Sequence, residues 1–97
     1  DPQPLIALVA QNDSARTANF TLAHQLRQAG HRVRLDLTGK SMKAQMKAAG
    51  RWQARWVILR GEQEMADGTA TLRNMAEGTQ ETLPLTALLQ KLPPSQH

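Results

Sequence analysis

The stretch PLIALVA, from Pro4 to Ala10, is an unbroken apolar run with the length of a β-strand. Such a run is typical of a central strand in a parallel sheet, because helices cover both of its faces. Apolar residues then recur at helical spacing and predict a helix over residues 14–29. They are Ala15, Ala18, Leu22, Leu26 and Ala29. Asp13 or Ser14 is expected to cap this helix, and Gly30 is expected to end it.

A second strand and a second helix follow in the same alternation. In RVRLDL, residues 32–37, charged and apolar residues alternate. This pattern predicts a strand with one face in water, near an edge of the sheet. The next segment, TGKSMKAQMKAAGR, runs from Thr38 to Arg51 and is expected to contain a helix that docks its apolar side on the sheet. That apolar side consists of Met42, Met46 and Ala49.

Short strands dominate the second half of the chain. RWVILR, residues 55–60, reads as another apolar strand, whereas GEQEMADG, residues 61–68, is expected to be a turn-rich connector. The segments at 69–74 and 79–84 are expected to form a hairpin around the glycine-containing turn MAEG. A last helix is expected within PLTALLQKL, residues 84–92. Its buried side is expected to consist of Leu85, Leu88, Leu89 and Leu92.

The order β α β α β β β α indicates an α/β fold, with a mixed five-stranded sheet as the middle of three layers and helices on its faces. Right-handed crossovers place strand 5–10 between the strands at 32–37 and 55–60. The carboxyl ends of these parallel strands then meet at one rim, with the loops QNDS, TGKS and RGEQE. Ligands usually bind at such a rim, where helix amino ends attract anions.

Composition limits the class of protein. A chain of 97 residues is expected to form a single domain, 1–97, because it is too short to build a second core. Residues 1–4 and 93–97 contain proline and are expected to be linkers or tails of a domain excised from a larger chain. There is no cysteine, no apolar run of about 18 residues and no visible signal peptide. We therefore expect a cytoplasmic protein without a membrane span.

Positive charge is concentrated between Arg16 and Arg60, where ten Lys or Arg residues are set against the single acid Asp36. In the helix expected after Thr38, four cations follow one another at spacings of three, four and four, so they form one narrow stripe. We call this stripe the basic ridge. It consists of Lys40, Lys43, Lys47 and Arg51. Such a row of unpaired like charges favours a phosphate-bearing partner.

Sequence signals for catalysis are weak. TGKS is similar to the end of a nucleotide-triphosphate loop, but Arg34 stands where that motif needs glycine. The three histidines lack the spacing of metal ligands, and no serine lies in a nucleophile elbow. Glu62 and Glu64 form the remaining acid–base candidate and are expected to be exposed. We therefore expect no catalytic residue, no metal and no cofactor in this domain by itself.

Four motifs follow one another in a fixed order: SMKAQMKAA, WVILRGEQE, DGTATLRN and EGTQETLPL. Their run, from Lys40 to Pro84, resembles the carboxy-terminal anticodon-binding domain of class II aminoacyl-tRNA synthetases, and most closely that of the histidyl enzyme. Upstream, LRQAGHRVRLDL also fits this family. Three positions depart from it: Gly50 stands where histidyl enzymes commonly have Asp, Gln53 replaces a usual Gly, and Arg73 stands where the family's basic residue is often Lys. The resemblance implies a separate catalytic domain in the parent chain, which would use ATP and magnesium.

The resemblance also implies site residues. Glu64 and Arg73 stand where relatives such as the threonyl enzyme use polar residues, so they are expected to contact anticodon bases, with Lys47 nearby. A carboxylate accepts hydrogen bonds from base amino groups, and a guanidinium donates to base acceptors or phosphate. Alternatively, Glu64 and Arg73 form a surface ion pair worth about 0–1 kcal/mol. Trp56 is expected in the core and Trp52 at the helix end, with base stacking as an alternative role for Trp52.

The expected function is recognition of a tRNA anticodon, as the non-catalytic domain of a histidine–tRNA ligase whose parent chain is a homodimer. The basic ridge would follow RNA phosphates beside the rim, and rim residues would read the bases. Two alternatives stay open. One is a regulatory or paralogous synthetase-like module that dimerises or senses uncharged tRNA. The other is a flavodoxin-like domain that binds a small molecule at the same rim.

Overall fold

The computed structural model describes residues 4–35 and 41–92 of the chain, which form five strands and four helices. In chain order they are β1 (Leu5–Ala10), α1 (Asp13–Gln28), β2 (Arg32–Leu35), α2 (Met42–Arg51), β3 (Trp56–Arg60), α3 (Glu62–Asp67), β4 (Thr69–Asn74), β5 (Thr79–Pro84) and α4 (Leu85–Lys91). Each strand lies within the segment predicted for it. None of the described helices is long and apolar enough to cross a membrane.

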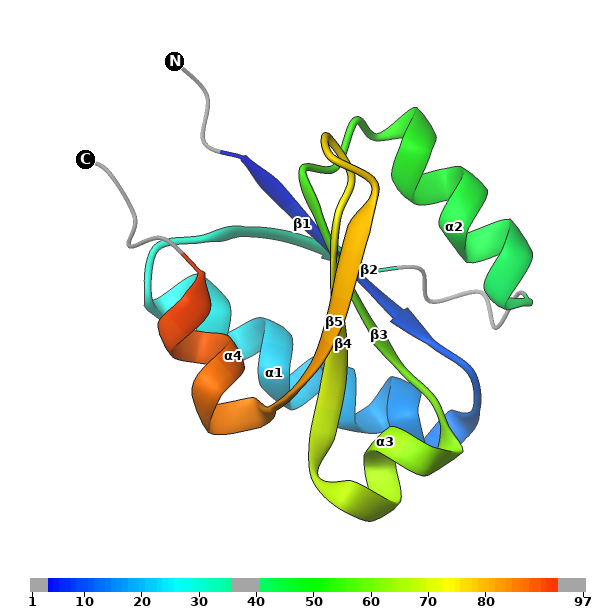
Figure 1. Cartoon of the computed structure of the whole chain (residues 1–97), viewed down its shortest axis with the longest axis vertical. Helices are drawn as coiled ribbons and strands as arrows, with labels where there is room; N and C mark the ends of the chain where they lie inside the picture. The colour runs from blue at the N-terminus through cyan, green and yellow to red at the C-terminus, as the bar shows by residue number, and fades with distance from the viewer. Residues whose placement is uncertain (1–3, 36–40, 93–97) are drawn as a thin grey trace.

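The five strands form one mixed sheet with the order β2-β1-β3-β4-β5. This order confirms that β1 lies between β2 and β3, and that β2 is an edge strand. β1 is parallel to both neighbours, with Leu8 opposite Leu35 on one side and Ile58 on the other. β4 and β5 continue the sheet in antiparallel orientation. Figure 1 shows α1 and α4 on one side of the twisted sheet and α2 on the other, so the predicted three layers are confirmed.

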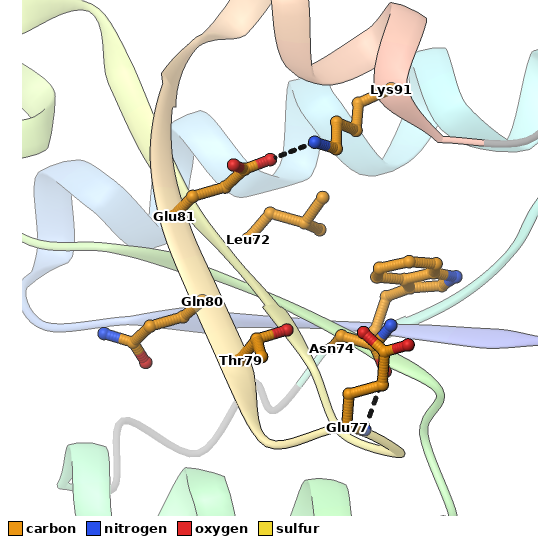
Figure 2. Close-up of a pocket in the computed structure, with 8 residues that line it drawn as sticks. Leu72, Asn74, Glu77, Thr79, Gln80, Glu81 and Lys91 are labelled. Atoms are coloured by element: carbon orange, nitrogen blue, oxygen red, sulfur yellow. Dashed lines mark hydrogen bonds and ion pairs between the residues drawn. The ribbon is translucent and has the colours of Figure 1, made fainter.

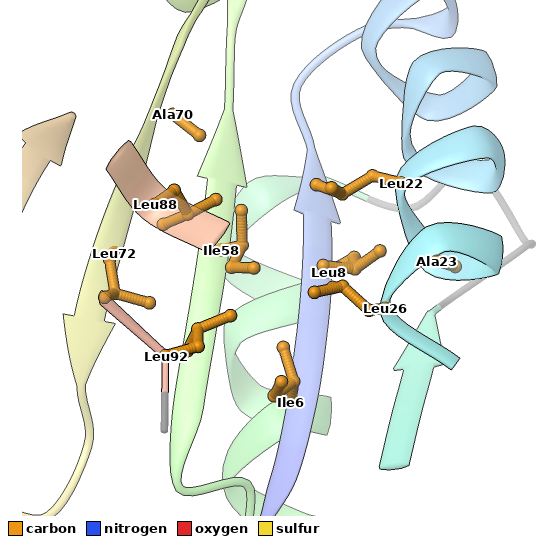
Figure 3. Close-up of a cluster of buried hydrophobic side chains, with 10 residues drawn as sticks. All are labelled: Ile6, Leu8, Leu22, Ala23, Leu26, Ile58, Ala70, Leu72, Leu88 and Leu92. Atoms are coloured by element: carbon orange, nitrogen blue, oxygen red, sulfur yellow. The ribbon is translucent and has the colours of Figure 1, made fainter. Parts of the chain in front are cut away.

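The larger hydrophobic core lies between the sheet and the helices α1 and α4. Figure 3 shows side chains from the strands and from both helices meeting there. They are Ile6, Leu8, Leu22, Ala23, Leu26, Ile58, Ala70, Leu72, Leu88 and Leu92. On the opposite face, a smaller cluster joins β1 and β3 to α2. It consists of Ala7, Val9, Ala49, Ala54 and Val57, with Met42 and Met46 packed against it. β1 is therefore covered on both faces, as its continuous apolar run predicted.

The cap of α1 differs from the prediction. The side chain of Asn12 accepts the backbone N–H of Ala15 at 2.8 Å, so Asn12 is the N-cap and the helix begins at Asp13. The prediction that Asp13 or Ser14 caps the helix was wrong. The run Asn12-Asp13-Ser14 offers three side chains that can each cap a helix, and the first of them takes this role.

Two predictions in the second half of the chain were also wrong. The segment 61–68, expected to be a connector, contains the short helix α3, whose first turn is closed by a Glu64 side chain that accepts the Gly61 backbone N–H at 2.7 Å. Leu89, expected on the buried side of α4, is 42% exposed. The sheet-facing side of α4 is occupied by Leu85, Leu88 and Leu92, and Leu89 points away from it.

Helices α1 and α2 end in the same way. In each, two backbone N–H groups beyond the helix donate to carbonyl groups of its last turn: those of Gly30 and His31 in α1, and those of Gln53 and Ala54 in α2. This ending requires a positive φ, which is 95° at Gly30 and 59° at Gln53. Gly30 thus ends α1 as predicted. Gln53 occupies a backbone conformation in which glycine is favoured. This is the position at which histidyl enzymes usually have Gly.

Candidate nucleic-acid interface

Helix α2 carries the described part of the basic ridge. Ser41 caps the helix, because its Oγ accepts a backbone N–H from the first turn at 3.2 Å. Lys43, Lys47 and Arg51 are exposed and stand four residues apart, so they share one side of α2. Lys40, the fourth predicted member, lies outside the described residues. The stripe predicted from the sequence is therefore present on the surface for the three members that the structure describes.

Carboxylates do not neutralise this part of the ridge. Within residues 4–35 and 41–92, the ion pairs join Arg16 to Asp13 on α1 and Lys91 to Glu81 at the α4–β5 contact. Like charges at a spacing of four repel one another by about 0.2–0.5 kcal/mol per pair. An anion outside the protein would relieve this repulsion, which makes the ridge suited to a polyanion.

Gln45 anchors α2 to the sheet from the side opposite the ridge. Its side chain is 3% exposed and forms two hydrogen bonds with the backbone of Ala10 at the end of β1. The Ala10 N–H donates to Gln45 Oε1 at 2.9 Å, and Gln45 Nε2 donates to the Ala10 carbonyl at 2.7 Å. The side-chain amide of Gln45 thus satisfies the backbone N–H and carbonyl of Ala10, as the backbone of a neighbouring strand would. No local pattern in the sequence indicates this role.

The direction of α2 places the ridge along the sheet rather than only beside the rim. Gln45, in the first half of α2, is bonded to the last residue of β1. After α2 the chain returns to the other end of β1, where the Arg55 N–H donates to the Leu5 carbonyl at 2.9 Å. α2 therefore runs antiparallel to β1. Lys43 lies near the rim, whereas Arg51 lies at the far end, so the prediction that the whole ridge borders the rim was wrong.

The rim itself is held by Gln11. Its backbone N–H donates to the Arg60 carbonyl at 3.0 Å, and its side-chain Oε1 accepts the Glu62 backbone N–H at 3.1 Å. A Cβ on Gly61 would lie 2.3 Å from this Oε1, so the close approach depends on the absence of a side chain. Ala10 is bonded to Gln45 of α2, and the next residue, Gln11, is bonded to the first residue of α3. The two helices are therefore linked through these two neighbouring residues at the end of β1.

Arg60 is the one buried cation among the described residues. It is 5% exposed, and its Nε has no hydrogen-bond partner within the described part of the chain. Burial lowers the pKa of the Arg60 guanidinium, and the nearby Glu64 carboxylate opposes this shift. Glu64 therefore has two structural tasks: one oxygen closes the first turn of α3, and its charge faces Arg60.

Arg73 lies on β4, on the α2 side of the sheet. Because Ala70 and Leu72 point into the larger core, the alternation of a strand directs Arg73 to the opposite face. Arg73 Nη1 donates to Gln80 Oε1 of β5 at 3.0 Å, and the hydroxyl groups of Thr71 and Thr82 lie 2.9 Å apart on the same face. α2 packs chiefly against β1, which leaves this face of the hairpin open to solvent.

Glu64 and Arg73 are not paired with each other. Glu64 follows the carboxyl end of β3, whereas Arg73 stands opposite Val57, near the beginning of β3. The alternative of a Glu64–Arg73 ion pair is not found in the described structure, where ion pairs join other residues. Arg73 lies away from the rim, because the antiparallel direction of β4 carries it toward the other end of the sheet.

The two tryptophans occupy different environments. Trp52 is the C-cap residue of α2 and packs, half-buried, against the smaller cluster, as predicted. Trp56, which was expected in the core, packs against the larger cluster but is half-buried. It lines a cavity of about 290 Å³ between the β4–β5 hairpin and α4, shown in Figure 2. Glu77, Glu81 and Lys91 also line this cavity, which lies on the face opposite α2.

In the described part of the chain, no three His, Asp or Glu side chains are grouped as metal ligands.

Residues 3–93 match a family described as the anticodon binding domain. The chain belongs to this family. It is 41% identical to the histidine–tRNA ligase of Syntrophotalea carbinolica and 37% identical to that of Symbiobacterium thermophilum, in each case over 91 residues and 94% of the chain. The match covers 22% and 21% of these relatives, so the chain spans about a fifth of their length.

Solved structures agree with this assignment. The apo histidyl-tRNA synthetase of S. aureus matches 94% of the chain with a TM-score of 0.85 and 30% identity, and 27% of that protein is covered. The RNA binding domain of threonyl-tRNA synthetase from Cryptosporidium parvum matches 94% of the chain, with a TM-score of 0.80 and 23% identity, over 23% of its own chain. The second likeness supports the fold alone. The α/β anticodon-binding fold expected from the motifs is confirmed.

Proposed function

We propose that this domain binds the anticodon arm of a tRNA, preferentially histidine tRNA, as part of a histidine–tRNA ligase. The observation that carries the proposal is that Lys43, Lys47 and Arg51, the described part of the basic ridge, are exposed and lie outside the ion pairs of the described residues, on a domain of the anticodon-binding family. The curated relatives are histidine–tRNA ligases, which favours histidine tRNA over other tRNAs. In the parent enzyme we expect a homodimer, located in the cytoplasm, with ATP and magnesium used by a separate catalytic domain.

Affinity and selectivity are assigned to different residues. Lys43, Lys47 and Arg51 present charges on a helix side and are suited to phosphates, which carry no sequence information. Lys40 belongs to the same set by its spacing in the sequence. Phosphate contacts therefore position the RNA against α2.

Base reading is assigned to Arg73 and Glu64. Arg73 offers guanidinium donors on an open sheet face, where unstacked bases of a loop can approach. The rim residue Gly61 lies four positions beyond Val57, the residue opposite Arg73, which corresponds to about 13 Å along a strand. Glu64 and Arg73 are therefore expected to contact different nucleotides.

The proposal is tested by titrating the 97-residue chain with anticodon hairpins and following fluorescence anisotropy of a labelled RNA. One hairpin carries the histidine anticodon, and the others differ from it at single anticodon bases. We expect the histidine hairpin to bind about 5- to 150-fold more tightly, because a good base contact contributes about 1–3 kcal/mol. Equal binding to all hairpins would contradict the proposal and would favour a regulatory module with relaxed anticodon reading.

A matched pair of variants tests the phosphate contacts of α2. Lys43→Ala is expected to weaken all hairpins by the same factor, since it removes a phosphate contact. Gln28→Ala changes an exposed residue of α1 on the other side of the sheet, and it should leave every hairpin unaffected.

A further inference from the structure

A second cationic element lies on the α2 side of the molecule. The guanidinium carbon of Arg34, on β2, lies 4.3 Å from the centroid of the Trp52 ring. This distance is well within the range of a cation–π contact. Arg34 is exposed and Trp52 is half-buried, so the indole ring covers one side of a guanidinium that is otherwise accessible to solvent.

Both partners are held in place by the fold. Val33 and Leu35 pack against the larger core, so alternation along β2 directs Arg34 to the α2 side. Trp52 is fixed as the C-cap of α2, where its backbone N–H donates to the Ala48 carbonyl at 2.9 Å. Its side chain rests on the smaller apolar cluster. The position of the ring is therefore set by core packing, independently of Arg34.

The stacked guanidinium is arranged for a phosphate. Stacking uses the face of the planar group, while the N–H donors along its edge can form two parallel hydrogen bonds to a phosphate. Trp52 reduces the freedom of a long side chain, so less entropy is lost when the phosphate binds. Within residues 4–35 and 41–92, the ion pairs join Arg16 to Asp13 and Lys91 to Glu81, so Arg34 is not part of either. Arg51, the last cation of the basic ridge, directly precedes Trp52 in the chain.

We infer that Arg34 is a further RNA phosphate-binding residue and that Trp52 is its positioning residue. The pair continues the basic ridge from the end of α2 onto the edge strand β2. This inference rests on the proposed function, because the phosphate is that of the bound RNA. It adds a backbone contact beyond the four residues that the helical spacing identified.

The test measures hairpin affinity and its salt dependence for Arg34→Ala and Arg34→Lys. Arg34→Ala is expected to lower affinity roughly tenfold for every hairpin, as for loss of a charge-assisted bidentate contact, and to reduce the log–log salt slope by about 0.7. Arg34→Lys keeps the charge and should retain the slope, but it should bind several-fold more weakly because the planar fork is lost. Arg16→Ala, on α1, is the matched control and should have no effect.

The role of Trp52 is tested separately. Trp52→Leu should weaken binding in the presence of Arg34 but not when combined with Arg34→Ala, since a positioning residue acts only through its partner. In a Trp56→Phe background Trp52 is the sole tryptophan, and its emission should change on RNA binding. Thermal unfolding of each variant checks that the fold is intact.

Two results separate the inference from the proposed function. If Lys43→Ala weakens binding while Arg34→Ala leaves affinity and salt slope unchanged, the inference about Arg34 is wrong and the proposed function stands. If the unmodified chain does not bind hairpins, both are wrong.

Discussion

Replacing Gln45 with Met tests how α2 is held on the sheet. Met has nearly the same length and shape but cannot form the two hydrogen bonds, at 2.9 and 2.7 Å, to the backbone of Ala10. Because the site is buried, the N–H and carbonyl of Ala10 would lose their partner, at about 1–3 kcal/mol for each group. We expect Gln45→Met to lower the free energy of unfolding by about 2–6 kcal/mol. For a domain of this size, even a loss of about 2 kcal/mol corresponds to a fall in Tm of roughly 8–16 °C.

The assay is urea unfolding followed by circular dichroism, with amide hydrogen exchange at Ala10 as a local probe. The matched control is Gln25→Met, an exposed position of α1 with the same chemical change, which should alter stability by less than about 0.5 kcal/mol. Exchange at Ala10 should become faster in Gln45→Met than global unfolding explains. A stability loss as small as that of the control would refute the argument that the buried Gln45 amide stabilises the fold by bonding the backbone of Ala10.

Four further substitutions have expected outcomes. Gln53→Gly should stabilise the chain by about 0.5–1 kcal/mol in urea unfolding, because φ is 59° there; a destabilised variant would show that the Gln side chain is needed. Gly61→Ala should lower the free energy of unfolding by about 1 kcal/mol, since the new Cβ displaces the Gln11 side chain from its hydrogen bond with the Glu62 N–H. Unchanged stability in urea unfolding would mean that this hydrogen bond does not stabilise the fold. Glu64→Gln keeps an oxygen to close α3, and Arg73→Ala removes a surface donor, so both should reduce discrimination among hairpins by about 1–3 kcal/mol. Uniform weakening across hairpins would instead assign these two residues to backbone contact.

Local patterns were sufficient to predict most of the fold. The hairpin at 69–74 and 79–84 is marked by a glycine-containing turn and alternating residues, and the continuous apolar run of β1 placed it in the middle of the sheet. α3 was missed because six residues are too few to show an apolar period. Its signals are a Glu at the third helical position and Gly68, whose φ of 70° ends the helix.

The site was only partly predictable. The basic ridge is visible in the sequence because its members share one helix and its period of 3.6 residues. The contacts of Gln45 with Ala10 and of Arg34 with Trp52 join residues that are far apart in the chain, so no local pattern reveals them. The position of Arg73 away from the rim depends on the antiparallel direction of β4, which a sequence motif does not reveal.

The most direct test of the central claim is the salt dependence of hairpin binding between 50 and 200 mM salt. Each phosphate contact with single-stranded RNA contributes about −0.7 to the log–log slope, so Lys43, Lys47 and Arg51 together predict a slope of about −2. Engagement of Lys40 takes the predicted slope to about −3, and engagement of Arg34 as well takes it to about −3.5. The corresponding loss of affinity over this range is roughly 20- to 130-fold. A slope near zero would contradict the account, because it would show that the basic ridge on α2 does not bind RNA phosphates.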